Sequence, residues 1–184
     1  MRAVCLFPAM HGYRLDDEAV EGVFKAAATH GAAVFVHCGV LTVGVRQKLG
    51  LPSRFDLRLG DPLALARMAT GFPQVPVIVP HFGAGFFREA LIAADQCPTI
   101  HFDTSSSNSW IRFHSGLTLE SVFGSTIAVV GRSRLLFGTD SSFFPRGWQK
   151  GIYEQQIRAM TTAGISVDDR QQILAANFDR LFPA

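Results

Sequence analysis

The stretch VIVPHFG, residues 77–83, joins a short apolar run to a polar residue, and it has two counterparts elsewhere in the chain. The stretch AVFVHCG (33–39) leads from an apolar run to His37, and LLFGTD (135–140) ends in Asp140. Short runs that are apolar at consecutive positions and bounded by turn residues are typical of parallel strands buried on both faces. The pattern predicts a parallel sheet whose strands place polar side chains at their carboxyl ends.

Working outward, five such runs alternate with segments that have helical apolar spacing. The predicted strands are Ala3–Phe7, Ala33–His37, Val77–His81, Thr99–Asp103 and Leu135–Gly138. Asp16 or Asp17 is predicted to cap a helix that ends at Gly31, and Asp61 to cap one that runs to Gly71. The other predicted helices run from Phe86 to Asp95, Leu117 to Val130, Ile152 to Ala163, and Asp168 towards Leu181. Such alternation indicates an α/β fold with right-handed crossovers.

Two architectures fit this alternation. A doubly wound sheet of five strands would be complete in 184 residues, whereas a (β/α)8 barrel normally needs about 250 residues. Periodicity alone favours the doubly wound sheet. The polar strand ends favour the barrel, because ligands of parallel α/β folds bind at the carboxyl edge of the sheet. The doubly wound alternative also lacks a glycine-rich phosphate loop after its first strand, where Phe7-Pro8-Ala9-Met10 stands instead.

The composition excludes several classes of protein. The chain is 48% hydrophobic and 17% charged, which does not suit a disordered protein. A net charge of +2 gives no argument for a nucleic-acid or anionic-membrane partner. No apolar run reaches the roughly 18 residues of a membrane helix, and three cysteines are too sparse for a disulfide framework. We expect a single domain, residues 1–184, of a cytoplasmic protein with a small-molecule partner.

The polar residues at the strand ends have metal-binding chemistry. His37, His81 and Asp140 combine imidazole and carboxylate groups, a normal ligand set for zinc that also suits manganese or iron. Taken singly, each has a structural alternative, a hydrogen-bonded framework histidine or a capping aspartate. Three such residues on one edge of the sheet make that structural alternative weaker. Asp103, which shares a strand face with His101, is either a further site residue or a turn aspartate before Ser105–Ser109.

In order, VFVHCG, VIVPHFG, LLFGTDSSFFP and the closing ILAANFDRLF resemble the amidohydrolase-related family. The resemblance is to the branch of amino-carboxymuconate-semialdehyde decarboxylase and its hydrolase relatives, and it covers essentially the whole chain. It implies a partial TIM barrel, about strands four to eight with their helices, truncated at the N-terminus. Cys38, between His37 and Gly39, makes the first motif a near match.

The resemblance also implies a role for each polar residue. His37 resembles the metal ligand of strand five and Asp140 that of strand eight. His81 resembles the strand-six histidine that orients or deprotonates the water, and it is a third candidate ligand. The implied cofactor is a divalent metal, zinc first, with Mn²⁺ or Fe²⁺ as alternatives. The strand-one His-x-His pair of the family has no counterpart among the remaining histidines.

The implied activity is that of a metal-dependent hydrolase, in which metal-activated water attacks a carbonyl-type carbon of a small molecule. The stretch 38–60 carries basic residues that would suit an acidic substrate, unless it is a solvated excursion. Candidate substrate contacts are Arg54, Arg146 and Trp148, the latter two in a segment that could instead pack against the core.

Two alternatives stay open. One is a related metal-dependent decarboxylase. The other is a catalytically inactive truncated barrel that serves as a binding or interaction module, because the strand-one ligands are absent. The open strand edges of a partial barrel would favour association, so a homo-oligomer is also expected.

Overall fold

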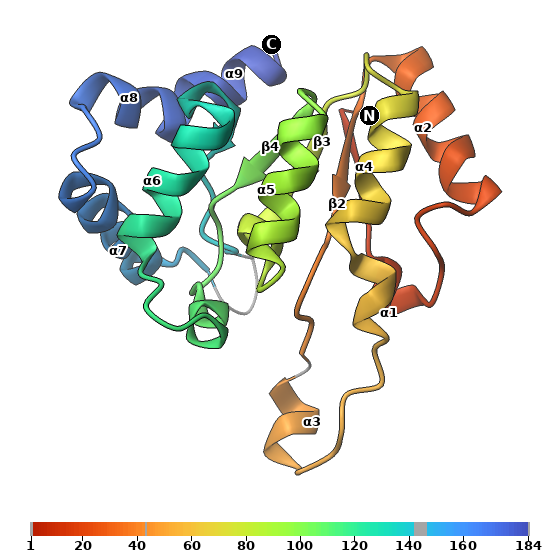
Figure 1. Ribbon diagram of the computed structural model, residues 1–184, viewed down its shortest axis with the longest axis horizontal. Coiled ribbons are helices and arrows are strands. Elements are labelled where there is room, and N and C mark those ends of the chain that lie inside the picture. Colours follow the sequence, from red (N-terminus) through yellow and green to blue (C-terminus); the bar gives the residue numbers. More distant parts are fainter. Residues whose placement is uncertain (1, 43, 142–146, 184) are drawn as a thin grey trace.

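The computed structural model describes residues 2–42, 44–141 and 147–183, and it contains one parallel sheet of five strands (Figure 1). The strands are β1 (Ala3–Leu6), β2 (Ala33–Val36), β3 (Val77–Val79), β4 (Ile100–Asp103) and β5 (Leu135–Leu136). Their order in the sheet is β1-β2-β3-β4-β5, with every neighbouring pair parallel. Each strand is added on the same side of its predecessor, as in a barrel, whereas a doubly wound sheet reverses direction. The sheet is therefore singly wound.

All five strands lie where the sequence predicts them, but each is one or two residues shorter. Of the predicted strand ends, His37 lies in a loop and His81 in the 3₁₀ turn η2 (Pro80–Gly83), because the backbone turns out of the sheet before them. The prediction overran the ends because the apolar pattern continues into the first loop residues.

The helices alternate with the strands. Their bounds are α1 (Pro8–His11), α2 (Glu18–His30), α3 (Gly44–Lys48), α4 (Pro62–Gly71), α5 (Phe87–Gln96), α6 (Leu119–Val130), α7 (Lys150–Thr162), α8 (Val167–Gln171) and α9 (Asn177–Leu181). A π-helical turn, η5 (Gln172–Ala176), joins α8 to α9, so the predicted closing helix is one continuous helical segment with a wider turn inside it. Short 3₁₀ turns are η1 (Leu57–Gly60), η2 (Pro80–Gly83), η3 (Ser109–Phe113) and η4 (Arg132–Arg134).

Two helices begin at aspartates that could cap them, and only one of these aspartates makes the capping hydrogen bond. Asp61 is the N-cap of α4, as predicted: its carboxylate accepts a hydrogen bond of 2.8 Å from the backbone N–H of Leu63. Asp17 occupies the N-cap position of α2, but its side chain accepts from the backbone N–H of Arg14 instead. The start of α2 therefore lies where the sequence predicts it, without the expected side-chain cap.

Alternate strand residues separate the two faces of the sheet. Val34, Val36, Val77 and Val79 belong to the large core that the sheet forms with its covering helices. Helices α4, α5 and α6 lie side by side over this outer face (Figure 1). Ala33, Ile78 and Leu136 point the other way and form a small second core. This inner face corresponds to the interior of a barrel.

The end of the chain covers part of the inner face. Leu181 and Phe182 pack against the small core of Ala33, Ile78 and Leu136. The guanidinium of Arg2 donates to the backbone oxygens of Phe182 and Pro183, so the last turn is tied to the start of β1. Ala33, Ile78 and Leu136 are buried in this way, whereas Ala3 and Phe35 beside them are only partly buried.

The connection after β2 is a long excursion. Short helix α3 stands away from the rest of the chain, beyond the carboxyl ends of the strands (Figure 1). In the described part of the chain, no helix has the length and apolar character needed to cross a membrane.

Candidate functional site

The carboxyl ends of β2 and β3 bring two histidines together. His37 follows β2, and its backbone N–H donates to the oxygen of Leu6 in β1 at 2.9 Å. Its ring stacks on Phe7, with centroids 5.9 Å apart, and meets the His81 ring edge-on at 5.4 Å. The predicted pair of histidines is thus assembled at one edge of the sheet.

Gly39 makes this close approach feasible. The loops after β2 and β3 are joined by a hydrogen bond of 2.7 Å from the Val40 N–H to the Ala84 oxygen. A Cβ on Gly39 would lie 2.2 Å from the oxygen of Gly83, and its backbone has a φ of +80°. Both the contact and the left-handed backbone require glycine here. The glycine of the VFVHCG motif therefore has a structural reason, independent of the cysteine before it.

Burial controls the charge of His37. The residue is only 7% exposed. Burial lowers the pKa of His37 to about 4, with a further lowering by His81 and a partial offset by Asp140. The imidazole is therefore neutral at pH 7, the state in which it can donate a lone pair to a cation.

His81 is held by a neighbouring strand. It lies in η2 at the start of a run of left-handed residues, with φ values of +57° at His81, +52° at Phe82 and +43° at Ala84. Residues other than glycine take this conformation at an energetic cost, and such positions cluster at functional sites. The Nδ1 atom of His81 lies 2.8 Å from the Oγ of Ser105, which follows β4.

Ser105 in turn contacts Asp103, the last residue of β4. Its backbone N–H donates to the Asp103 carboxylate at 2.5 Å. Burial raises the pKa of Asp103, while hydrogen bonds from the side chain and backbone of Ser105 lower it. Asp103 therefore forms a turn with Ser105. This turn lines the same hollow as His37, His81 and Asp140.

Asp140 completes the group at the end of β5. It is exposed, with a φ of +56°, and it is close enough to His37 and Asp103 to influence their pKa values. Gly138 lets this segment approach β4, because a Cβ there would lie 2.9 Å from the Cβ of Ser105 and 3.0 Å from an Asp103 oxygen.

These strand ends open into a cavity of about 330 Å³, which we call the strand-end cavity. Its lining includes His37, His81 and Asp140, and also residues that sequence reasoning missed. The missed residues come mainly from Ser106 to Phe113, including Ser107, Trp110 and Arg112. Ala84 also lines the cavity, as do four residues of the stretch 38–60: Val40, Leu41, Thr42 and Gln47. An adjoining hollow of about 430 Å³ reaches Asp103 and Ser105. The serine-rich segment after β4 was the available signal, but from the sequence it was considered only as the segment that follows Asp103.

The candidate substrate residues are less well placed. Arg54 is exposed on the excursion, where Arg46 and Arg58 bond to Pro52 and Asp56 of the same excursion. These arginines therefore fit better with a solvated excursion than with a substrate-binding stretch. Trp148 is 60% exposed and lies against Phe137 and Tyr153. Arg146 lies outside the described residues.

The metal site stays a prediction, because the described residues supply suitable donor types but too few of them. His37 and Asp140 are donors of the right type for zinc or manganese. Among the described residues, however, no three histidine, cysteine or acidic side chains converge closely enough to hold an ion. The described residues fit part of a coordination shell, and the other positions would need water or donors from outside the described part of the chain.

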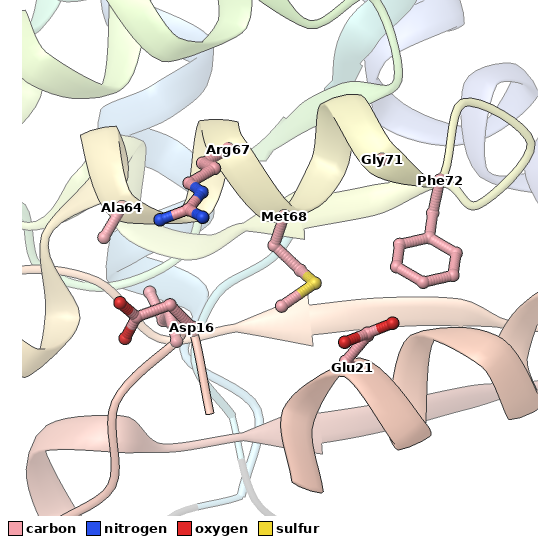
Figure 2. Close-up of a pocket in the computed structure, with 8 residues that line it drawn as sticks. Asp16, Glu21, Ala64, Arg67, Met68, Gly71 and Phe72 are labelled. Carbon is pink, nitrogen blue, oxygen red and sulfur yellow. The ribbon is translucent and has the colours of Figure 1, made fainter. Parts of the chain in front are cut away.

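A second hollow, of about 280 Å³, lies between α2 and α4 (Figure 2). Asp16, Arg67, Met68 and Phe72 line it, and Figure 2 shows Arg67 and Met68 extending from α4 towards the α2 side. It lies in the helix layer and shares no lining residue with the strand-end cavity. It has no histidine or cysteine, so it offers no comparable chemistry.

Comparison with protein families identifies the arrangement. The family model described as amidohydrolase matches residues 1–184, the whole chain. The chain belongs to the amidohydrolase family. No curated protein matches the sequence.

Solved structures of this amidohydrolase fold extend the comparison. The structure of an uncharacterized TIM-barrel protein from Bordetella bronchiseptica is similar with a TM-score of 0.70 and 20% identity, over 98% of this chain and 57% of that one. An amidohydrolase from Burkholderia multivorans with bound zinc is similar with a TM-score of 0.59 and 14% identity, over 91% of this chain and 58% of that one. A third similar structure is a dihydroxybenzoic acid decarboxylase from Polaromonas sp. JS666 with bound manganese and the inhibitor 2-nitroresorcinol. Its TM-score is 0.59 and its identity 15%, over 92% of this chain and 55% of that one.

The chain thus spans a little over half the length of these solved relatives. Together with the singly wound sheet, the similarity confirms the expected fold, a partial TIM barrel. Because the sequence identities are 20% or less, these structures show similarity of fold alone.

Proposed function

We propose that this chain carries part of the active site of a metal-dependent hydrolase that adds water to a carbonyl-type carbon of a small molecule. One observation carries the proposal: His37, His81 and Asp140 line a single cavity at the carboxyl edge of the sheet. Active sites of TIM-barrel enzymes lie at this edge. Membership of the amidohydrolase family supports the reaction class.

The side chains of this chain would divide the work. The buried, neutral imidazole of His37 offers a lone pair to a cation, and the Asp140 carboxylate offers an oxygen. His81, fixed through Nδ1, has Nε2 left to exchange a proton with substrate or water. A divalent metal, when bound, would act as a Lewis acid towards water and the carbonyl group.

Arg112 gives the cavity a preference for anions. It lines the strand-end cavity together with the hydroxyl side chains of Ser106, Ser107 and Ser109. Its guanidinium lies 5.0 Å from the centre of the Phe113 ring, a cation–π distance that orients the group. A guanidinium beside hydroxyl groups suits a carboxylate. An acidic substrate is therefore part of the proposal, with Arg112 in the role first considered for Arg54 and Arg146.

The test is metal content. The purified chain is equilibrated with Zn²⁺ or Mn²⁺, dialysed, and analysed for metal per chain by mass spectrometry. The variant is the double substitution His37→Ala, Asp140→Ala. The matched control is His30→Ala, Asp168→Ala, which removes an exposed histidine and an exposed aspartate from α2 and α8.

We expect about one metal per chain in the wild type and the control, and loss in the double variant. Metal at the same level in all three proteins would contradict the assignment of these ligands. Absence of metal from a wild type that has a folded circular dichroism spectrum would overturn the proposal that His37 and Asp140 of this chain hold the metal.

Decarboxylation of an aromatic acid is the second candidate. It is favoured by the Arg112 and serine side chains of the cavity, which suit a carboxylate leaving as CO₂. A dihydroxybenzoic acid decarboxylase is among the similar structures. Release of CO₂ from a dihydroxybenzoate, measured with metal-loaded protein beside ester and amide hydrolysis, separates the two reactions.

A further inference from the structure

A closed ring of hydrogen bonds lies between the end of β4, the segment after β5 and helix α7. The hydroxyl of Thr104, the residue after β4, donates to the Gln156 Oε1 at 2.6 Å. The Gln156 Nε2 donates to the backbone oxygen of Gly138 at 2.8 Å. The backbone N–H of Gly138 donates back to the Thr104 Oγ1 at 3.4 Å, the longest of the three bonds. Each member of the ring therefore donates one hydrogen bond and accepts one.

The chemistry of the groups allows one direction around this ring. A backbone N–H only donates and a backbone oxygen only accepts, so Gly138 gives a proton to Thr104 and takes one from the Gln156 Nε2. The hydroxyl proton of Thr104 is then left for the Gln156 Oε1, which only accepts. If the Gln156 amide were turned over, its oxygen would face the Gly138 oxygen. The partners thus fix the orientation of the side-chain amide.

Burial makes the ring costly to open. Thr104 is 0% exposed and Gln156 is 1% exposed. Glutamine is seldom fully buried, and a buried amide without partners is destabilising. An apolar side chain of similar length would fill the same space without needing partners. The amide of Gln156 therefore contributes its two hydrogen bonds rather than its volume.

The ring replaces the sheet where pairing has ended. Pairing between β4 and β5 ends at Leu136, so the Gly138 peptide lies beyond the ladder and needs other partners. The ring supplies one for its N–H and one for its oxygen. Tyr153, one turn before Gln156 on α7, packs its ring against Phe137 with centroids 5.8 Å apart. One face of α7 thus holds the chain as it leaves the sheet.

A second anchor lies on the other side of Asp140. The Ser141 Oγ accepts a hydrogen bond of 3.0 Å from the backbone N–H of Gln149, the N-cap residue of α7. The two anchors bracket Asp140, whose φ of +56° is uncommon for a residue other than glycine. Residues 138–141 all line the hollow next to the strand-end cavity. Their backbone therefore sets where the carboxylate of Asp140 lies.

We propose that Gln156, closed into a ring with Thr104, is a positioning residue that fixes the Gly138 peptide and thereby places the Asp140 carboxylate at the strand-end cavity. Gln156 is not among the described residues that line the cavity or the hollow, so it acts through the backbone and touches no reacting atom. The functional importance of this anchor rests on the proposed role of Asp140, whereas the anchoring of residues 138–141 does not depend on it.

The first test is proton–nitrogen NMR of the metal-free full chain, which gives the chemical shifts and the hydrogen exchange of the amides in residues 138–141. Gln156→Met removes both hydrogen bonds of the side chain and keeps a similar length. Thr104→Val removes the hydroxyl and keeps the shape, whereas Thr104→Ser keeps the hydroxyl. The control is Gln155→Met, which changes the exposed neighbour of Gln156 on the same helix.

We expect the Gln156 side-chain amide of the wild type to exchange with water much more slowly than that of Gln155, because it is buried and hydrogen-bonded. Gln156→Met and Thr104→Val should lose protection at the Gly138 amide and shift the signals of residues 138–141. Thr104→Ser and Gln155→Met should match the wild type. Fast exchange of the wild-type Gln156 amide, or unchanged signals of residues 138–141 in Gln156→Met, would overturn the proposal. If Gln156→Met does not fold, Thr104→Val and the wild-type exchange decide.

Metal affinity tests whether the anchor serves Asp140. Gln156→Met should weaken Mn²⁺ binding by about ten- to a hundredfold, the usual cost of removing a partner behind a ligand. Ile78→Ala is the comparison, because it removes a buried side chain from the small second core and leaves the ring intact. It should bind Mn²⁺ like the wild type. An equal loss in both variants would overturn the positioning role, because lowered stability would then be the cause. A wild type that binds no metal would count against the proposed hydrolase, whereas the amide signals would still decide the anchoring.

Discussion

The two halves of the inner sheet face differ in chemistry although the same strands build both. Towards the amino ends, Ala33 and Ile78 are buried under Leu181 and Phe182. Towards the carboxyl ends, the same face leads to His37 and to the Asp103–Ser105–His81 network. The first half needs only apolar area to be stable, whereas the second needs specific hydrogen bonds. The predictions below test that division.

The two largest effects should be of similar size, one in each half, and the first comes from the apolar half. Ile78→Ala removes a side chain that is 5% exposed and leaves a cavity between β3 and the last turn of the chain. We expect a loss of about 2–5 kcal/mol in the free energy of unfolding, measured by urea denaturation.

Ile92→Ala is the matched control, because Ile92 is 46% exposed on α5. Its free energy of unfolding should change by no more than about 0.5 kcal/mol. Equal losses in the two variants would show that the last turn does not seal the inner face.

The polar half should be most sensitive at Gly39. Gly39→Ala places a Cβ 2.2 Å from the Gly83 oxygen on a left-handed backbone. The backbone conformation costs about 1–2 kcal/mol and overpacking about 1–3 kcal/mol more. The loops after β2 and β3 should also separate, which the amide and histidine NMR shifts around His37 and His81 would report.

Gly12→Ala separates the two contributions. Gly12 has a φ of +73°, but nothing lies within 4 Å of its added Cβ. We expect only the backbone cost of about 1–2 kcal/mol there. If Gly39→Ala is no more costly than Gly12→Ala, the close approach of the two loops is not tight.

The pH dependence of stability probes a titratable group inside the sheet. Burial lowers the pKa of His101 on β4, with further lowering by Arg134 and Arg180, and the hydrogen bond with the Thr99 oxygen opposes this. The unfolded chain therefore binds more protons as the pH falls below about 6.5. The free energy of unfolding should be unaffected by His101 above that pH, and it should decline as the pH falls towards the lowered pKa of His101.

His101→Asn should remove this part of the decline between pH 8 and pH 5, by up to about 1.4 kcal/mol per pH unit, the slope for one proton. Unfolding free energies at several pH values provide the measurement. His30→Asn, at the exposed end of α2, should retain the wild-type slope. A wild-type slope in His101→Asn would contradict the burial argument.

The smallest effect should be on ligand binding. Arg112→Gln removes the charge that favours anions in the strand-end cavity. Because Arg112 is exposed, we expect only about a three- to tenfold weaker affinity for benzoate, about 1 kcal/mol. Trp110 lines the cavity, so its fluorescence in a Trp148→Phe background reports binding.

Benzyl alcohol, which lacks the charge, should bind both proteins alike. An equal loss for benzoate and benzyl alcohol would mean that Arg112 supports the shape of the cavity rather than recognising charge.

Much of the fold was accessible from local sequence. The positions of the five strands and the start of α4 at Asp61 follow from apolar runs and a capping aspartate, which are local properties. Strand order is not local, so periodicity alone favoured the doubly wound sheet over the singly wound sheet that forms. His37, His81 and Asp140 could be chosen because each lies within a few residues after an apolar run. Arg112 could not, because its approach to the cavity depends on the loop after β4.

The sequence by itself determined the alternation of strands and helices, the amidohydrolase family and the polar residues at the strand ends. Each depends on residue type and on spacing along the chain. Tertiary structure decided what those residues contact. It made His37 neutral by burial, set Ser105 behind His81, and brought Arg112 rather than Arg54 to the cavity. Burial and hydrogen-bond partners come from residues distant in sequence, and only the folded chain brings them together.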